Sequence, residues 1–324
     1  MAPFDAVLFV AFGGPQGPDD VRPFLANVLR GRRVSPERVE EVAHHYERFG
    51  GVSPLTDLTM KQARALESTL AARGLPLPVH VGMRNWHPFL ADTLTEMSAR
   101  GVRRAIGILA AAQRSYSGCL QYRENVRDAR AVVRQAGAPA PEIVYVGDWH
   151  EHPGFIAAHA DHVRRAYEAL SPGVRDRARL IFTAHSIPTP MARRYPYEAQ
   201  LQASARLIAQ AAGRADWTLV YQSRSGRPED PWLEPDICDY LRRERAAGLD
   251  AAVLCPVGFL CDHVEVLYDL DVEAAAVCRE TGIAMARAEA VNVHPAFIEA
   301  LADAVAGTYG RYRGGRPLAL AAAV

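Results

Sequence analysis

Short apolar runs alternate with amphipathic segments along almost the whole chain. The apolar runs are rich in valine, isoleucine, leucine and alanine and end at glycine, proline or polar residues, which is typical of buried strands. We expect strands at 5–12, 78–83, 104–110, 142–147, 179–184, 216–221, 251–255 and 283–287. The amphipathic segments predict helices at 18–30, 36–48, 57–73, 88–100, 118–136, 153–170, 198–213, 234–247, 263–281 and 295–307.

The regular alternation of strands and helices indicates an α/β fold with parallel sheets and helices on both faces. The crossovers should be right-handed, and eight strands divide naturally into two halves of four. We therefore predict two Rossmann-like domains, over residues 1–150 and 151–324, each with a four-stranded parallel sheet flanked by helices. Because no low-complexity linker separates the halves, we expect them to pack tightly around a ligand cleft. Ligands of such sheets bind beyond the carboxyl ends of the strands, so the residues after each strand are the candidates for chemistry.

The composition is that of a globular protein and excludes some classes of function. The chain has 324 residues, 49% of them hydrophobic, and its 37 basic residues balance 37 acidic ones. This balance argues against a nucleic-acid-binding protein, which would show a basic excess. The five cysteines form no C-x-x-C pair, and no apolar run reaches the roughly 20 residues of a membrane span. We therefore expect a cytoplasmic protein in a reducing compartment, without a disulfide framework.

A histidine, His185, follows the fifth predicted strand. Its position at the carboxyl end of a central parallel strand would place one edge of the imidazole in the expected cleft. Imidazole has a reference pKa of about 6.5, so it can accept a proton at neutral pH or ligate a transition metal. A histidine that is hydrogen-bonded within the core is an equally consistent interpretation of the position alone.

Three acidic residues lie four apart in the helix predicted at 263–281. Glu265, Asp269 and Glu273 therefore form one line along that helix, next to an apolar face. Like charges at this spacing repel one another unless water or a cation intervenes. A carboxylate line that opens on a strand-end cleft suits a path for divalent cations or protons. A solvated acidic stripe is the alternative.

Four histidines gather around the helix predicted at 153–170. His159 and His162 share a face of that helix, which leaves adventitious metal binding open, but the chain has no H-E-x-x-H motif. We interpret both, together with His150 and His152, as surface histidines.

Two cysteines, Cys255 and Cys261, flank the turn after the seventh predicted strand. An iron–sulfur cluster needs four close ligands, and four cannot be assembled around this turn. We expect both thiols to be buried and inert.

Several segments together carry a resemblance to a known family. Residues 183–188, Thr-Ala-His-Ser-Ile-Pro, match the pattern S/T-x-H-S-I/L-P, which is a signature of the ferrochelatase family. Residues 256–269 resemble the second signature of that family. Further matches, in the expected order, lie at 12–15, 30–32, 50–55, 82–86, 222–223 and 231–235. The chain therefore resembles a ferrochelatase over most of its length.

This resemblance implies the class II chelatase fold, in which two similar four-stranded domains enclose a porphyrin cleft. It implies insertion of ferrous iron into a metal-free porphyrin, with release of two pyrrole protons. By match to the motifs, His185 and Glu265 are the catalytic pair and the metal ligands, and they face each other across the macrocycle. Asp269 and Glu273 continue the acidic line as an accessory path. No redox step and no cofactor beyond the ferrous iron substrate is implied.

Within the family, the chain is similar to the short bacterial enzymes of actinobacterial type that use coproporphyrin III. Some relatives have a tyrosine where Phe12 stands, and Phe12 cannot ligate iron. Relatives with an iron–sulfur cluster carry a C-terminal cysteine group, whereas the last cysteine here is Cys278, so we predict no cluster. The matches imply a set of porphyrin-binding residues: Phe12, Arg30, His45, Tyr46, Ser53, Tyr122 and Ser223.

The partners that we expect are coproporphyrin III, ferrous iron and, transiently, neighbouring enzymes of the haem pathway. We expect a monomer without a membrane span. Three other functions stay open: a protoporphyrin IX ferrochelatase that makes protohaem, a porphyrin or haem carrier without turnover, and a cobalt or nickel chelatase acting on another tetrapyrrole.

Overall fold

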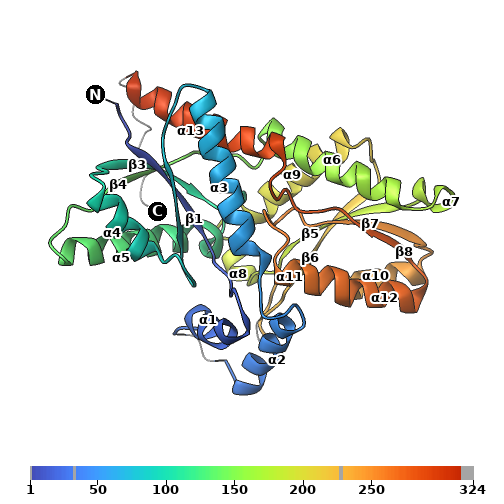
Figure 1. Cartoon of the computed structure of the whole chain (residues 1–324). Coiled ribbons are helices and arrows are strands. Elements are labelled where there is room, and N and C mark those ends of the chain that lie inside the picture. The colour runs from blue at the N-terminus through green and yellow to red at the C-terminus, as the bar shows by residue number, and fades with distance from the viewer. Residues whose placement is uncertain (1, 32–33, 226–228, 315–324) are drawn as a thin grey trace.

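Two four-stranded parallel sheets form the centre of the molecule (Figure 1). A computed structural model of the chain describes residues 2–31, 34–225 and 229–314, so Arg32 of the quoted segment 30–32 and the last ten positions of the predicted second domain lie outside the described residues. The first sheet has β1 (Ala6–Ala11), β2 (Val79–Met83), β3 (Arg104–Leu109) and β4 (Glu142–Tyr145). The second has β5 (Arg179–His185), β6 (Trp217–Gln222), β7 (Ala251–Cys255) and β8 (Ala284–Arg287). All eight predicted strands are confirmed.

Helices connect the strands at each predicted place. In the first half they are η1 (Pro18–Asp20), α1 (Val21–Val28), α2 (Pro36–Glu47), α3 (Pro54–Ala72), α4 (Leu90–Ala99), η2 (Tyr116–Leu120) and α5 (Gln121–Gln135). In the second they are α6 (Pro153–Ala169), α7 (Pro172–Arg175), α8 (Thr189–Ala192), α9 (Tyr197–Ala211), α10 (Ile237–Ala246), α11 (Val264–Val266), η3 (Leu267–Ala274), α12 (Ala275–Thr281) and α13 (Pro295–Arg313). The short α7 and α8 were not predicted, because a single helical turn carries too few residues to show a period.

The two sheets repeat one topology. The strand order is β2-β1-β3-β4 in the first sheet and β6-β5-β7-β8 in the second, so β5 takes the place of β1. The chain shows no convincing sequence repeat, yet the backbone follows the same path twice. His185 therefore ends a strand that is flanked on both sides, in register with Gln222 of β6.

Period-two alternation along the central strands explains why helices cover both faces of each sheet. In β1, Phe9 belongs to the large core and Leu8 to a separate cluster with α4 and α5. In β5, Phe182 packs toward α6 and α9, whereas Ile181 packs toward α10 and α12. Helices α6 and α12 thus lie on opposite faces of the second sheet, as Figure 1 shows.

One continuous apolar core joins the two halves, as expected from the absence of a linker. It contains residues of β1, α3, α6, β5 and α13. Helix α13 returns from the second half to pack against α3, and Arg73 pairs there with Asp303 at 2.8 Å. Helix α13 follows the second sheet in sequence but contacts both halves, so it does not mark a boundary between them. The division at residue 150 therefore stays a prediction.

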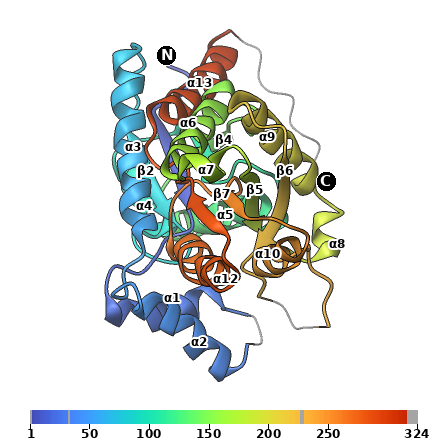
Figure 2. The same ribbon diagram turned by 90° about the vertical axis from the view of Figure 1, so that its right-hand side faces the viewer.

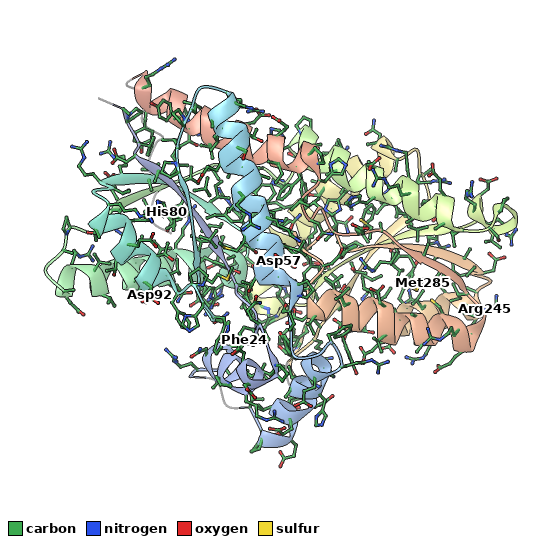
Figure 3. All side chains as sticks on the ribbon, in the orientation of Figure 1. Phe24, Asp57, His80, Asp92, Arg245 and Met285 are labelled. Atoms are coloured by element: carbon green, nitrogen blue, oxygen red, sulfur yellow. The ribbon has the colours of Figure 1, made fainter. Side chains whose placement is uncertain are left out.

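Helices α1 and α2 project from the sheets beside the second half (Figures 1 and 2). A small apolar cluster holds them there, in which Phe24 and Tyr46 pack with Val264. Figure 3 shows side chains filling the space between these helices and the sheets, with Phe24 labelled on α1. Among the described residues, no helix combines the length and apolarity that a membrane crossing needs.

Candidate active site

His185 is the last residue of β5, and its side chain reaches the carboxyl edge of the second sheet. Its Nδ1 lies 2.5 Å from the carbonyl oxygen of Ser186, so Nδ1–H donates to that oxygen. The proton on Nδ1 leaves a lone pair on Nε2. The side chain is 34% exposed, so Nε2 is available to a ligand.

The turn after β7 lies directly against the end of β5. The N–H of Gly258 donates to the carbonyl of Thr183 at 3.1 Å, and a Cβ at Gly258 would lie 2.7 Å from the Cβ of Ala184. Only glycine permits this close approach. His263 then caps α11 by accepting the N–H of Glu265 through Nδ1 at 3.2 Å. The turn and the cap together bring Glu265 next to His185.

His185 and Glu265 lie on the same side of any bound macrocycle. The Nε2 of His185 is 3.9 Å from Oε2 of Glu265. A flat ring between these atoms would need roughly 7 Å, twice the optimal separation of about 3.5 Å between stacked atoms. The expectation that the two residues face each other across the macrocycle is therefore wrong. The motif matches could not reveal this, because they give sequence positions and no relative depth.

The spacing of the pair suits a single cation. Two lone-pair atoms 3.9 Å apart repel unless a proton or a cation lies between them. Bonds from a borderline divalent cation to imidazole nitrogen and carboxylate oxygen are about 2.0–2.2 Å. One such cation can thus bind both atoms with little movement, and nitrogen with oxygen ligands suits iron.

Asp269 lies one step further along the acidic line, beside the end of β6. The Nε2 of Gln222 donates to Oδ2 of Asp269 at 3.1 Å, and the hydroxyl of Ser223 donates to the same oxygen. Burial raises the pKa of Asp269 to about 7, the bond from Ser223 lowers it, and the charge of Glu265 raises it. At neutral pH this carboxyl can both accept and release a proton.

Glu273 follows Asp269 and meets a further carboxylate from α10. Burial raises the pKa of Glu273, and the nearby Asp236 raises it further. Asp236 is the N-cap of α10, and burial raises its pKa as well. The predicted line of three carboxylates is present: Glu265 and Asp269 are partly buried, whereas Glu273 is exposed, so the alternative of a solvated acidic stripe describes only the outer end of the line.

The helix that carries these carboxylates is α-helical only at its ends. Residues 267–274 form the π-helical segment η3, between α11 and α12. The sequence predicts one α-helix over 263–281, because π turns leave no period that a short segment can show. A π segment widens the turn and is frequent at functional sites.

Two buried tyrosines of the first half lie near Glu265. Burial raises the pKa of Tyr46 well above its usual value, and Glu265 raises it further. Burial also raises the pKa of Tyr122, which Arg84 lowers and Glu265 raises. The carboxylate of Glu265 therefore lies where the two halves meet.

Arg84 connects the aromatic residues of the first half. Its guanidinium carbon lies 4.9 Å from the ring centroid of Tyr122 and 5.5 Å from that of Phe12. Phe12 follows β1 directly and is partly exposed. The carboxyl edge of the first sheet thus brings the partly exposed ring of Phe12 close to a guanidinium, a combination that suits a flat anionic ligand, whereas Tyr122 is buried in the first half.

Three other residues predicted to bind porphyrin, His45, Ser53 and Arg30, have partners within the protein. The ring of His45 stacks on Tyr268 of η3 with centroids 3.6 Å apart, which ties α2 to the acidic helix. Ser53 is buried and caps α3 by accepting the N–H of Leu55. Arg30 is exposed and donates to Asn27 at 2.6 Å. These three roles toward porphyrin stay predictions.

The histidines of α6 differ from expectation. His159 and His162 are buried, so the interpretation as surface histidines is wrong for both. Burial lowers the pKa of His159 to about 3, which keeps this imidazole neutral. The thiols of Cys255 and Cys261 are buried as expected, and burial raises the pKa of Cys261 to about 12, so it carries no thiolate at neutral pH.

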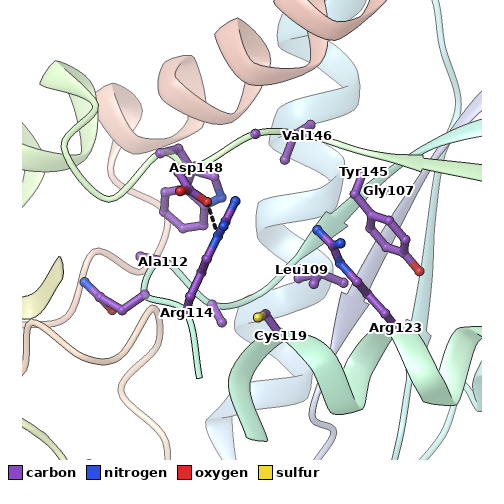
Figure 4. Close-up of a pocket in the computed structure, with 13 residues that line it drawn as sticks. Gly107, Leu109, Ala112, Arg114, Cys119, Arg123, Tyr145, Val146 and Asp148 are labelled. Atoms are coloured by element: carbon purple, nitrogen blue, oxygen red, sulfur yellow. Dashed lines mark hydrogen bonds and ion pairs between the residues drawn. The ribbon is translucent and has the colours of Figure 1, made fainter. Parts of the chain in front are cut away.

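A recess apart from this site lies at the carboxyl ends of β3 and β4 (Figure 4). Its volume of about 40 Å³ holds a few waters and no macrocycle. Arg114 pairs with Asp148 across it at 2.6 Å. Its lining comes from the first half alone, so it does not belong to the site around Glu265.

Three residues of the site were not singled out by sequence reasoning: Arg84, Gln222 and Tyr268. Arg84 and Gln222 lie inside segments that resemble the family, and each follows or ends a strand, which was a usable signal. Tyr268 lies inside the second signature, 256–269, but no strand end marks it, and its contact with His45 depends on the packing of α2.

Comparison with known proteins shows the family of the chain. Residues 4–308 match the family model described as Ferrochelatase. A ferrochelatase of Rhodopirellula baltica is 49% identical over 96% of this chain and 88% of its own length. Coproporphyrin III ferrochelatases of Streptomyces coelicolor and Mycolicibacterium smegmatis are 46% and 47% identical, over 97% and 93% of this chain and 88% and 89% of their own lengths. The structure of SirB from Bacillus subtilis with Fe3+ is similar in fold, with a TM-score of 0.60 and 11% identity, over 97% of this chain and 99% of that chain.

Proposed function

Because this chain belongs to the ferrochelatase family, we propose that it inserts ferrous iron into coproporphyrin III to give coprohaem in haem b biosynthesis. Enzymes of this family are metal chelatases, which are lyases. The reaction exchanges one Fe²⁺ for two protons on the pyrrole nitrogens, so charge and atoms balance without an oxidant or a reductant.

The paired lone pairs of His185 and Glu265, 3.9 Å apart at a strand-end edge, carry this proposal. Iron must reach the macrocycle while two protons leave it. Nε2 of His185 accepts a pyrrole proton, because Nδ1 already donates to Ser186. Glu265, on the same side of the ring, ligates the incoming iron, and His185 shares this iron only before its Nε2 takes up the proton, because one lone pair serves one partner at a time.

Asp269 and Glu273 extend this site as an accessory path for protons or iron. Asp269 carries a pKa of about 7, so it passes a proton onward without holding it. Glu273 and Asp236 continue the path away from His185. The path needs no group besides the side chains of the chain and water.

The choice of coproporphyrin III rests on the relatives and on the donors of the first half. Relatives named for this substrate are 45–48% identical, whereas the 49% identical relative is named a ferrochelatase only. Coproporphyrin III has four propionates, which need cationic and hydroxyl donors. Arg84 lies between the aromatic rings of Phe12 and Tyr122, and Arg30 lies exposed after α1.

The proposal also covers the role of Phe12, the location and oligomeric state of the protein, and its cofactors. Phe12 contacts the macrocycle through its ring and cannot ligate the product iron. The enzyme works as a cytoplasmic monomer, requires no cofactor besides the substrate iron, and contains no iron–sulfur cluster. Transient contact with neighbouring haem-pathway enzymes remains a prediction.

Anaerobic metal insertion tests the proposal. Purified protein is mixed with ferrous iron and either coproporphyrin III or protoporphyrin IX, and the absorbance of the macrocycle is followed. Faster turnover of coproporphyrin III supports the proposal. Faster turnover of protoporphyrin IX retains the chemistry and overturns the substrate, and porphyrin binding without turnover of either identifies a carrier.

A further inference from the structure

Asp161 and His162 of α6 and His294, which precedes α13, form a cluster outside the candidate active site. One ligand atom from each residue lies within 4.8 Å of the other two. His162 is buried, whereas Asp161 and His294 are partly exposed. The cluster is thus supported from inside the protein and open to water on its outer side.

His162 is oriented as a metal-binding histidine would be. Its Nδ1 lies 3.1 Å from the carbonyl oxygen of Glu289, so Nδ1–H donates to this backbone oxygen. A histidine ligand usually donates its second ring N–H to a carbonyl or a carboxylate, which fixes the ring and leaves the other nitrogen for the metal. The lone pair of the His162 Nε2 is available in this way.

His294 directs its Nε2 toward the carboxylate of Asp161. The distance from Nε2 to Oδ2 is 3.3 Å, and Nδ1 accepts the N–H of Ala296 as the cap of α13. The Nε2 proton therefore lies between the imidazole and the carboxylate, which is the position that a cation would occupy. When a cation binds Nε2, the ring proton moves to Nδ1. Nδ1 then no longer accepts the N–H of Ala296, and the bond to the cation takes the place of this capping bond.

Arg165 is the main competitor for the carboxylate of Asp161. Its Nη2 lies 2.7 Å from Oδ2, but its side chain is 68% exposed. Exposed ion pairs of this kind contribute little, so a coordinating cation displaces the guanidinium readily. Arg164 is further away, at 3.9 Å.

We propose that Asp161, His162 and His294 bind a divalent transition-metal cation that fastens the segment between β8 and α13 to α6. Two imidazoles with one carboxylate form a ligand set that suits ferrous iron and zinc. Bonds of about 2.0–2.2 Å require the ligand atoms to close by roughly 1–2 Å. Water completes the coordination on the open side.

The site is separate from the iron insertion site. Helix α6 and the helix that carries Glu265 lie on opposite faces of the second sheet (Figure 1). A cation at His294 fixes the start of α13, which packs against α3 of the first half. The cation therefore stabilises the joint between the halves and takes no part in the chemistry.

Zinc binding to the whole protein tests this inference. Metal-free wild-type protein and the variants His162→Gln and Asp161→Asn are compared by equilibrium dialysis against micromolar Zn²⁺. We expect each variant to bind one equivalent less than the wild type, or to bind it at least about tenfold more weakly. His44→Gln, an exposed histidine 3.9 Å from a carboxylate of Glu47, is the matched control and should bind as the wild type does.

Two further readouts keep the result unambiguous. Iron insertion by His162→Gln should stay within about twofold of the wild type, because the residue is remote from Glu265. Crystals of the wild-type protein soaked in Zn²⁺ should show an anomalous peak between the three side chains. Folded variants with undiminished zinc binding, or soaked crystals with no peak at this place, would overturn the proposal.

Discussion

The side-chain amide of Gln222 donates to Asp269 at 3.1 Å, while the backbone of Gln222 is paired in register with His185. One residue of β6 therefore holds the second carboxylate of the acidic line and also flanks the candidate base. Its neighbour Ser223 adds a second donor to the same carboxylate and has a positive φ of 60°. A non-glycine residue keeps such a conformation only where its surroundings enforce it, which is frequent at functional sites.

Replacing Ser223 by alanine should shift the pH dependence of iron insertion. The hydroxyl stabilises the charged form of Asp269, so its loss raises a pKa that already lies at about 7. The acidic limb of the profile of kcat/KM against pH should move to higher pH. Ser68→Ala, an exposed serine on α3, is the control. An unchanged acidic limb in the Ser223 variant would show that Asp269 does not limit the reaction.

Replacing His185 by alanine should abolish iron insertion and leave porphyrin binding largely intact. General-base catalysis contributes about 10²- to 10⁴-fold, and the variant also loses a metal ligand. Initial rates and the binding of porphyrin by fluorescence quenching measure the two effects separately. His44→Ala, whose side chain is exposed on α2, should keep its activity. Near-normal turnover by the His185 variant would contradict the proposed role.

Neutralising the three carboxylates should have graded effects. Glu265→Gln should lower kcat most, because Glu265 lies 3.9 Å from His185 and shares the metal with it. Asp269→Asn and Glu273→Gln should slow turnover more mildly, because a water molecule can take the place of one carboxylate in the path. Steady-state rates at saturating iron make the comparison. Equal losses in all three variants would refute a graded path.

Gly258→Ala should lower both stability and activity. The new methyl group would lie 2.7 Å from the Cβ of Ala184, so the turn must move away from β5. Overpacking of this kind costs about 1–3 kcal/mol, and the shift also displaces Glu265 from His185. Urea unfolding and initial rates measure the two effects. Gly173→Ala is the control, because nothing lies within 4 Å of its added Cβ.

The strands and most helices could be predicted because their signals are local. Each strand is a short, largely apolar run, and β1 and β5 are buried at successive positions, as strands covered on both faces must be. His185 was accessible because it lies at the end of a strand, and Glu265 because it begins a line of carboxylates at helical spacing. The short distance between His185 and Glu265 could not be predicted, because it depends on how closely Gly258 packs on Ala184.

Features that arise from packing were missed. Nothing in the sequence distinguishes a π segment at 267–274 from an α-helix, because eight residues span too few turns to show which period they follow. The burial of His162 depends on the segment before α13, which is remote in sequence. The contact of His45 with Tyr268 likewise requires the position of α2.

The repeated strand order has a consequence for how such a protein can change. The same path of the chain is used twice, but the histidine and the acidic helix belong to the second copy, and the aromatic rings with Arg84 belong to the first. If these rings and Arg84 contact the macrocycle as proposed, substitutions in the first copy can alter which tetrapyrrole is accepted without changing His185 or the acidic helix. Selection can then act on the choice of tetrapyrrole and on the metal chemistry separately.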